Sequence, residues 1–213
     1  EWVGELDCTF CPYLSMFNDG SQIQRYKAGA QEDANGNLWT YTCTGPKYPH
    51  PTLHIDDYAL GSRVAGWMSK DYGINGYLYW SAAYYNGRLT YKDDYIDVYG
   101  DASRENGSNG DSYLVYPGKY YGSEKPFPTN RLIAYRDSVD DYCMLSVLER
   151  ELNAYAEKYA IAEGIDVNDY VRDIYDSLYT GSKYYTDDAL LYQAREELSR
   201  RILALRNEDD LLA

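Results

Sequence analysis

Residues 38–44 read LWTYTCT and residues 72–82 read YGINGYLYWSA, and these two stretches decide the fold. Each holds a short run rich in aromatic, Thr, Cys or Leu residues, Leu38 to Thr44 and Tyr77 to Ala82, and turn residues bound both runs, which is typical of buried strands. Between them the sequence predicts a helix from about Asp56 to Tyr72, which ends before Gly73. A strand, a helix and a strand in this order form a βαβ unit, so we expect the two strands to pair in parallel.

A third strand-like run lies further upstream, from Leu6 to Pro12. The segment Asp19 to Ala34 that follows it is weakly helical, and Asn35-Gly36-Asn37 is a good turn signal. The sequence therefore predicts three parallel strands. Three parallel strands cannot close a barrel or bury both faces of a sheet, so we expect further strands in a segment before Glu1, the missing N-terminal half of the same protein.

The alternation of predicted strands and helices ends after the third strand. Tyr84 to Lys125 is a long, glycine-containing stretch with one strand-like run, Tyr113 to Tyr116. Because this stretch directly follows a strand, it lies at the end where α/β folds place their active sites. From Pro128 the pattern becomes helical, which divides the chain into residues 1–127 and residues 128–213.

Three helices are predicted in the second part. The first is long and carries one apolar stripe, formed by Leu132, Tyr135, Val139, Tyr142, Leu145, Leu148, Leu152, Tyr155 and Tyr159. The second covers about Asn168 to Tyr179. The third starts at a Thr186 cap and has a stripe formed by Leu191, Ala194, Leu198, Ile202 and Leu205. We expect the stripes to pack helix on helix or against the wall of the strands.

The charge of the chain argues against anionic partners. Asp and Glu number 34 against 20 Lys and Arg, which gives a formal net charge of −14. Such a field repels polyanions, so nucleic acid and anionic membrane surfaces are excluded as partners, and no stretch reaches the ~18 apolar residues of a membrane span. Neutral ligands carry no such penalty. Sugars are the obvious neutral class, and the 27 tyrosines fit sugar binding, although most of them have ordinary core and surface roles.

The two histidines and the four cysteines do not indicate a metal, cofactor or nucleophile site. His50 and His54 are separated by Pro51, so we do not expect one helix face to hold both, and we expect exposed loop or cap residues. No G-x-S-x-G motif supplies a serine nucleophile. The cysteines are Cys8, Cys11, Cys43 and Cys143; we expect small core residues, with a disulfide from Cys43 to Cys8 or Cys11 left open and the compartment unassigned.

Acidic side chains are missing from the predicted strand ends. Glycoside hydrolysis normally needs two carboxyl groups, and in a barrel they stand at the C-terminal ends of strands. The three ends read Phe10-Cys11-Pro12, Thr42-Cys43-Thr44 and Trp80-Ser81-Ala82. Glu5 and Asp7 fall at the start of the first strand. Asp93, Asp94 and Asp97 lie in the loop after the third strand, where turn and solvent-exposed roles are expected. The sequence therefore predicts no catalytic residue in this chain.

Aromatic side chains are better placed than acids for a role in the site. Trp39 and Tyr41 share a face of the second strand, Trp80 closes the third, and Tyr84 and Tyr85 follow just beyond. An aromatic residue at a strand end either stacks on a sugar or caps the barrel core. We take Trp39, Tyr41, Trp80 and Tyr85 as the candidate substrate-binding residues, with Trp39 deeper than Trp80.

Four segments together resemble the C-terminal region of glycoside hydrolase family 123-like catalytic domains, which occur in many bacterial proteins. They are Leu38 to Cys43, Arg63 to Trp67 leading to Tyr72 to Ser81, Tyr113 to Gly118, and Arg131 to Asp137 followed by Asp140-Asp141-Tyr142. The resemblance implies an α/β fold in which the chain forms the last three βα units of a (β/α)8 TIM-type barrel, followed by C-terminal helices that pack on it.

The resemblance also implies an activity. The family cleaves N-acetylgalactosaminides by a substrate-assisted route in which an Asp orients the acetamido group and an adjacent Glu is the general acid. No Asp followed by Glu occurs in this sequence, so the resemblance assigns no catalytic pair to it. The resemblance does imply that Trp39, Tyr41 and Trp80 form the wall of the sugar pocket. The family pattern continues after Trp80-Ser81 with an Asn, where this chain has Ala82, which leaves the sugar specificity open.

The function expected is therefore that of the C-terminal portion of a glycoside hydrolase resembling β-N-acetylgalactosaminidases. It would supply aromatic side chains to the pocket for a glycan or amino sugar, without the catalytic Asp-Glu pair. The compartment stays open, with an extracellular or cell-surface location in a bacterium as one expectation. Two alternatives remain: a non-catalytic glycan-binding module, and a structural or interaction domain that binds another chain and has no sugar affinity.

Overall fold

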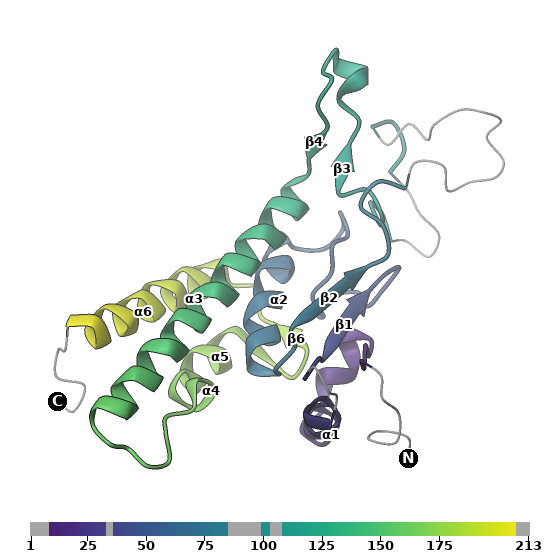
Figure 1. The fold of residues 1–213 in the computed structure, drawn as a ribbon. Helices are drawn as coiled ribbons and strands as arrows, with labels where there is room; N and C mark the ends of the chain where they lie inside the picture. Colours follow the sequence, from purple (N-terminus) through teal and green to yellow (C-terminus); the bar gives the residue numbers. More distant parts are fainter. Residues whose placement is uncertain (1–8, 33–35, 85–98, 103–107, 208–213) are drawn as a thin grey trace.

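The structure is a computed structural model that describes residues 9–32, 36–84, 99–102 and 108–207. A pair of parallel strands lies beside a group of helices, with α2 next to the strands and α3 and α6 beyond it (Figure 1). In chain order the elements are η1 (Leu14–Asn18), α1 (Gly20–Glu32), β1 (Trp39–Thr42), α2 (Ala59–Asp71), β2 (Gly76–Tyr79), β3 (Val115–Tyr116), η3 (Gly118–Tyr121), β4 (Phe127–Pro128), α3 (Asn130–Lys158), α4 (Val167–Tyr170), α5 (Arg172–Leu178), β5 (Tyr179–Thr180), β6 (Lys183–Tyr184) and α6 (Asp188–Asn207).

The central strands pair as the sequence predicts. β1 and β2 are parallel, with Trp39 opposite Gly76 and Thr42 opposite Tyr79. The upstream segment adds two parallel bridges to the other edge of β1, from Phe10 to Leu38 and from Tyr13 to Tyr41. It forms no continuous strand among the described residues, because the 3-10 helix η1 begins at Leu14. The parallel order is thereby confirmed, whereas the closed barrel stays a prediction.

The two faces of this sheet differ in what covers them. Leu38, on the helix side, is fully buried in one core with Trp67 and Met68 of α2, and Thr40 and Thr42 point the same way and are buried. The predicted end of α2 is confirmed, since Gly73 has φ +70° directly after the helix. The opposite face carries exposed side chains, which are Trp39, Leu78 and Trp80.

The long helix α3 differs from its predicted stripe. Thr129 caps it by accepting a hydrogen bond from the Leu132 amide. Its second half buries the expected Leu145, Leu148 and Leu152. In its first half the buried residues are polar, namely Arg131, Ser138 and Asp141, whereas Val139 of the predicted stripe is exposed. Residue type alone could not reveal this, because Arg131 and Asp141 are buried against partners on other segments.

Two ion pairs and one hydrogen bond join α3 to its neighbours through Asp141, which is fully buried. The Asp141 carboxylate accepts hydrogen bonds from Arg63 Nη2 at 3.0 Å and from Trp67 Nε1 at 3.1 Å, both on α2. Arg195 of α6 places its Nε 2.8 Å from Oδ1 of the same carboxylate. Asp141 therefore joins three helices that are far apart in the sequence. We call these four residues the Asp141 cluster.

The remaining helices are confirmed with changed boundaries. The predicted second helix is two, because Val171 (φ −112°, ψ 20°) interrupts it between α4 and α5. All five stripe residues of α6 are buried. Its first turn is capped by Asp187, whose Oδ1 accepts from the Ala189 amide at 3.0 Å, and not by Thr186. Because α2, α3 and α6 share one core, the two predicted regions pack together; the division at residue 127 itself stays a prediction.

Candidate functional site

The carboxyl ends of the parallel strands carry the best-formed cluster of polar and aromatic side chains. Trp80, one residue beyond β2, donates from Nε1 to both oxygens of Asp111, at 3.2 and 3.1 Å. The Tyr79 hydroxyl donates to Asp111 Oδ1 at 2.7 Å and accepts from the Ser112 amide at 2.9 Å. Burial and the bond to the carboxylate hold the pKa of Tyr79 well above its usual range. We call Tyr79, Trp80 and Asp111 the tip cluster.

Asp111 reaches the strand ends because the Gly-rich loop turns sharply before it. Gly110 has φ +74°, and the Asp111 amide donates to the Ser108 carbonyl at 3.0 Å. Arg131 of α3 stabilises the loop, because its guanidinium donates to the carbonyls of Gly110 at 2.7 Å and of Tyr113 at 2.6 Å. Asp111 is fully buried, so it fixes Trp80 and Tyr79 and does not face solvent.

Trp80 has the geometry of a binding platform. Its ring edge is fixed by Asp111, yet 41% of the side chain is exposed. The neighbouring ring of Tyr84 lies 4.8 Å away, centroid to centroid, at an interplanar angle of 57°. A rigid, exposed ring with a polar neighbour is suited to a ligand with both an apolar face and hydroxyl groups.

A second group of hydroxyl-bearing rings lies at the ends of the other two strand segments. The rings of Tyr13 and Tyr41 are 5.1 Å apart. Burial, together with the neighbouring Cys43, raises the pKa of Tyr13 to about 12, so this hydroxyl stays protonated at neutral pH and can donate a hydrogen bond. These residues offer neutral contacts only, and they do not supply an acid or a base for hydrolysis.

Trp39 differs from its expected position. It is 40% exposed, much like Trp80, so the prediction that it lies deeper is wrong. Its ring lies across Gly76 of β2, where an added Cβ would come within 2.4 Å of ring atoms. Glycine at this position therefore lets the indole lie flat on the uncovered face of the sheet. Trp39 and Tyr41 share this face as predicted, since Thr40 and Thr42 between and beyond them are buried.

Some predicted site residues fall outside the described part of the chain. Tyr85 of the candidate pocket lies there, as do Glu5, Asp7, Asp93, Asp94, Asp97 and Cys8. The three described cysteines are free thiols, so Cys43 and Cys11 form no disulfide.

The histidines are structural, but they are not exposed as predicted. His54 is buried, with Nε2 2.8 Å from the Cys43 carbonyl oxygen and Nδ1 3.5 Å from Asp57 Oδ2. His50 is half-buried, and its Nδ1 lies 2.9 Å from Ser182 Oγ. The polar partners supplied by distant segments explain why the loop can bury them. Within the described residues no three His, Cys, Asp or Glu side chains form a group that could hold a metal ion.

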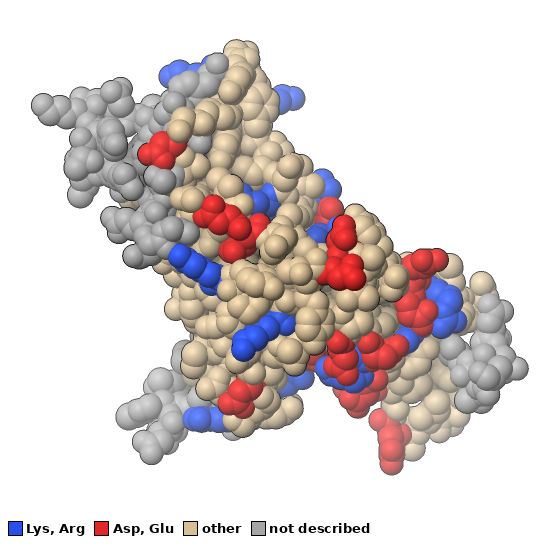
Figure 2. All heavy atoms as spheres, turned by 180° about the vertical axis from the view of Figure 1, so that it is seen from behind, with Lys and Arg blue, Asp and Glu red and all other residues tan. Residues whose placement is uncertain are grey.

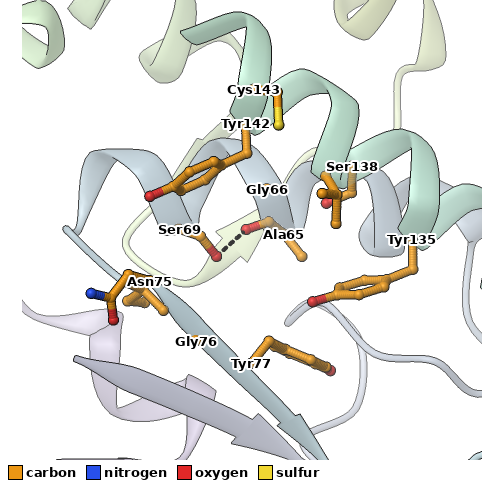
Figure 3. A pocket seen from close by; sticks show the side chains of 12 residues that line it. Ala65, Gly66, Ser69, Asn75, Gly76, Tyr77, Tyr135, Ser138, Tyr142 and Cys143 are labelled. Atoms are coloured by element: carbon orange, nitrogen blue, oxygen red, sulfur yellow. Dashed lines mark hydrogen bonds between the residues drawn. The ribbon is translucent and has the colours of Figure 1, made fainter. Parts of the chain in front are cut away.

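A pocket of about 320 Å³ lies on the helix side of the sheet, and no residue of the tip cluster lines it (Figure 3). β2, α2 and α3 form it, and Figure 3 shows the rings of Tyr77, Tyr135 and Tyr142 around it. Its lining is mostly apolar, and the Tyr77 hydroxyl is already hydrogen-bonded to Thr42. None of the predicted pocket residues contributes to it, so it is not the candidate sugar site.

The tip cluster contains two residues that sequence reasoning missed. Asp111 lies 31 positions after Trp80, in a loop whose course no local pattern predicts. Tyr79 belongs to a recognised strand, but only the structure shows its hydroxyl bonded to that carboxylate. The strand ends therefore do carry one acid, supplied by the loop and not by a strand.

Comparison with known proteins identifies the family. The family model described as glycoside hydrolase 123, catalytic domain, matches residues 11–148, which is more than half of the chain. No curated protein matches the chain. The matched region contains β1, α2, β2 and the tip cluster, and it ends within α3. The chain thus belongs to the glycoside hydrolase 123 catalytic-domain family, in agreement with the resemblance of its sequence segments.

Proposed function

We propose that the chain forms part of the sugar-binding wall of a glycoside hydrolase that acts on β-linked N-acetylgalactosaminides. The observation that carries this proposal is Trp80, an exposed indole whose edge is fixed on the buried Asp111 at the carboxyl end of a parallel strand. A ring held in one orientation loses little entropy when a sugar stacks on it. The family membership supports glycoside hydrolysis as the chemistry of the whole site.

The catalytic pair is proposed to come from another segment. The chain has no Asp followed by Glu, and the carboxylate of the tip cluster is buried and accepts hydrogen bonds from Tyr79 and Trp80. We propose that further strands complete a (β/α)8 barrel around the described sheet and bring the Asp-Glu pair. The uncovered face with Trp39, Leu78 and Trp80 supports this, since an apolar face of this kind is usually buried against other residues.

Sugar binding tests the proposal. Trp80→Ala is expected to weaken binding of N-acetylgalactosamine by the chain roughly tenfold or more, because the stacking surface is lost. Isothermal titration calorimetry measures the Kd of both proteins. Tyr192→Ala is the matched control, since Tyr192 of α6 is 65% exposed and far from the strand ends in sequence. An unchanged Kd for Trp80→Ala would rule out Trp80 as the stacking platform.

Hydrolysis gives a second, independent test. The 213-residue chain is expected to release no chromophore from an aryl N-acetyl-β-galactosaminide, because the general acid is absent. Turnover that disappears in Asp93→Asn or Asp94→Asn would contradict the proposal and place the acid in the loop after β2. A longer protein that includes a strand ending in an Asp-Glu pair gives a further comparison. If it binds the sugar but shows no turnover, the chain is part of a glycan-binding module. Tight association with another chain and no sugar affinity would indicate an interaction domain.

A further inference from the structure

The pocket on the helix side of the sheet has no part in the proposed sugar site. It lies between α2, β2 and α3 (Figure 3), and none of Trp39, Tyr41 and Trp80 lines it. Its volume of about 320 Å³ falls within the ~300–1,000 Å³ that is usual for ligand pockets. A pocket of this size, in a part of the molecule that the proposed function does not use, calls for a separate explanation.

The walls of the pocket are fixed by contacts among the elements that form them. The helices α2 and α3 lie in direct contact, since a Cβ added to Gly66 would come within 2.1 Å of the Ser138 carbonyl oxygen. On the β2 side, the Tyr77 hydroxyl is hydrogen-bonded to Thr42 of the neighbouring strand. A pocket with fixed walls is formed before its ligand binds, so little conformational entropy is lost on binding.

Apolar groups and aromatic rings form most of the lining. The rings of Tyr77 and Tyr135 lie 4.9 Å apart, centroid to centroid, at an interplanar angle of 38°. Ile74 and Val139 add aliphatic side chains to the wall. Such a lining favours a ligand with flat apolar rings.

The hydroxyl of Tyr135 points into this apolar space. Figure 3 shows it directed from α3 into the space between α3 and β2. Burial raises the pKa of Tyr135 to about 12, so the hydroxyl stays protonated at neutral pH. No hydrogen bond joins it to another described residue. It can therefore donate a hydrogen bond to an oxygen atom of a ligand.

Ser138 adds a second hydroxyl to the same wall. The residue is 1% exposed, and its Oγ has no hydrogen-bond partner among the described residues. Buried hydroxyls in proteins are usually satisfied by another group, by water or by a bound molecule. Ser138 lies three positions after Tyr135 on α3, so the two residues share one side of the helix. We expect the polar end of a ligand to lie beside them.

The lining contrasts with the charged outer surface of the molecule. On the face drawn in Figure 2, acidic and basic side chains lie side by side over the helices. None of the described residues that line the pocket carries a charge. The net charge of −14 also disfavours anionic ligands. The pocket is therefore suited to a neutral molecule.

The volume of the pocket limits the size of the ligand. An apolar cavity of about 150 Å³ holds one benzene ring. At about 320 Å³, this pocket has room for about two fused rings. Larger molecules would extend out of the pocket into solvent.

We propose that this pocket binds a neutral, mostly apolar small molecule of about two fused rings that carries a hydroxyl or carbonyl oxygen. The rings of the ligand pack against Ile74 and Tyr77, and its oxygen accepts a hydrogen bond from the Tyr135 hydroxyl. This site goes beyond the proposed function and does not depend on it, because no residue of the tip cluster lines the pocket.

Two matched probes test the site by equilibrium dialysis against the 213-residue chain. One is 2-naphthol, which has two fused rings and one hydroxyl, and the other is naphthalene, which has the same rings without the hydroxyl. Tyr135→Phe deletes only the hydroxyl of the protein and is expected to weaken 2-naphthol binding about fivefold, while the Kd for naphthalene stays unchanged. Tyr192→Phe deletes an exposed hydroxyl on α6 and is the matched control, with both Kd values unchanged.

Cys143 reports where the probe binds. Its thiol is exposed and lines the pocket, whereas Cys43 does not line it. With 2-naphthol at about ten times its Kd, alkylation of Cys143 by iodoacetamide is expected to slow about tenfold. Alkylation of Cys43 is expected to keep its rate. Mass spectrometry of the labelled peptides measures both rates in one sample.

Several outcomes would overturn this inference without touching the proposed function. If 2-naphthol does not bind, or if Tyr135→Phe binds it as tightly as the unchanged chain does, the pocket is not a site of this kind. If Cys143 is not protected, or if Trp80→Ala abolishes the binding of 2-naphthol, the probe lies elsewhere. Self-association in analytical ultracentrifugation, together with no binding of 2-naphthol, would mean that a second copy covers the pocket. Circular dichroism verifies that Tyr135→Phe keeps the fold.

Discussion

Replacing Asp141 by Ala is expected to lower the free energy of unfolding by about 3–5 kcal/mol. The carboxylate is fully buried, and it lies against two guanidinium groups, Arg63 and Arg195, and the Trp67 indole N–H. Its removal leaves two cations with reduced compensation and one buried donor without an acceptor. The penalty is large because the three helices that meet at Asp141 have no other shared polar contact of this burial among the described residues.

Urea unfolding, followed by circular dichroism, measures this effect as a shift of the midpoint at constant slope. Asp140→Ala is the matched control: it removes the same charge from the neighbouring position of α3, but Asp140 is exposed and the cost is expected to stay below about 0.5 kcal/mol. Equal shifts for the two variants would mean that the Asp141 cluster contributes no more than an exposed carboxylate.

Arg131→Met is expected to destabilise the protein by about 3 kcal/mol or more, and to loosen the tip cluster as well. The guanidinium donates to three carbonyls on two segments, that of Leu53 at 2.5 Å in one loop and those of Gly110 at 2.7 Å and Tyr113 at 2.6 Å in another. Methionine fills a similar volume but leaves these acceptors unsatisfied, at about 1–3 kcal/mol for each buried group. Burial lowers the pKa of Arg131 from its usual range, yet the group stays charged at neutral pH.

The second part of this prediction follows from the position of Gly110. Because Arg131 fixes the backbone just before Asp111, its loss frees the carboxylate that orients Trp80. Urea unfolding reports the stability, and the affinity for N-acetylgalactosamine reports the tip cluster. Arg136→Met is the control, since Arg136 lies on the same helix, is exposed and pairs only with Asp137 among its described contacts. Full stability and full affinity in Arg131→Met would disprove the role of this residue.

Much of the fold could be predicted from the sequence because it follows from local periodicity. The βαβ unit around α2 and the apolar stripe of α6 are patterns of neighbouring residues, and the structure confirms both. The first half of α3 could not be predicted in this way. Arg131 and Asp141 are buried there because their partners lie on the loops and on α2 and α6, more than 15 positions away.

The candidate site was predictable in part. Trp80 is a strand-end aromatic, and its position follows from the strand alone. The prediction that Trp39 lies deeper than Trp80 was wrong. The exposure of Trp39 depends on Gly76, the residue that β2 places beneath the ring. Asp111 could not be found, since only the tertiary course of the loop brings it to Trp80. Side chains that depend on a single long-range contact leave no periodic signal.

The Asp141 cluster shows that residues of the family resemblance can lie outside the candidate site. Arg63, Trp67 and Asp141 lie in the segments by which the sequence resembles its family, and in the structure they contact one another far from the strand ends. The likeness of these helical segments to the family thus reflects, in part, how the helices pack. A match in these helices therefore says little about chemistry, and activity has to be judged at the strand ends, where Trp80 and Asp111 lie.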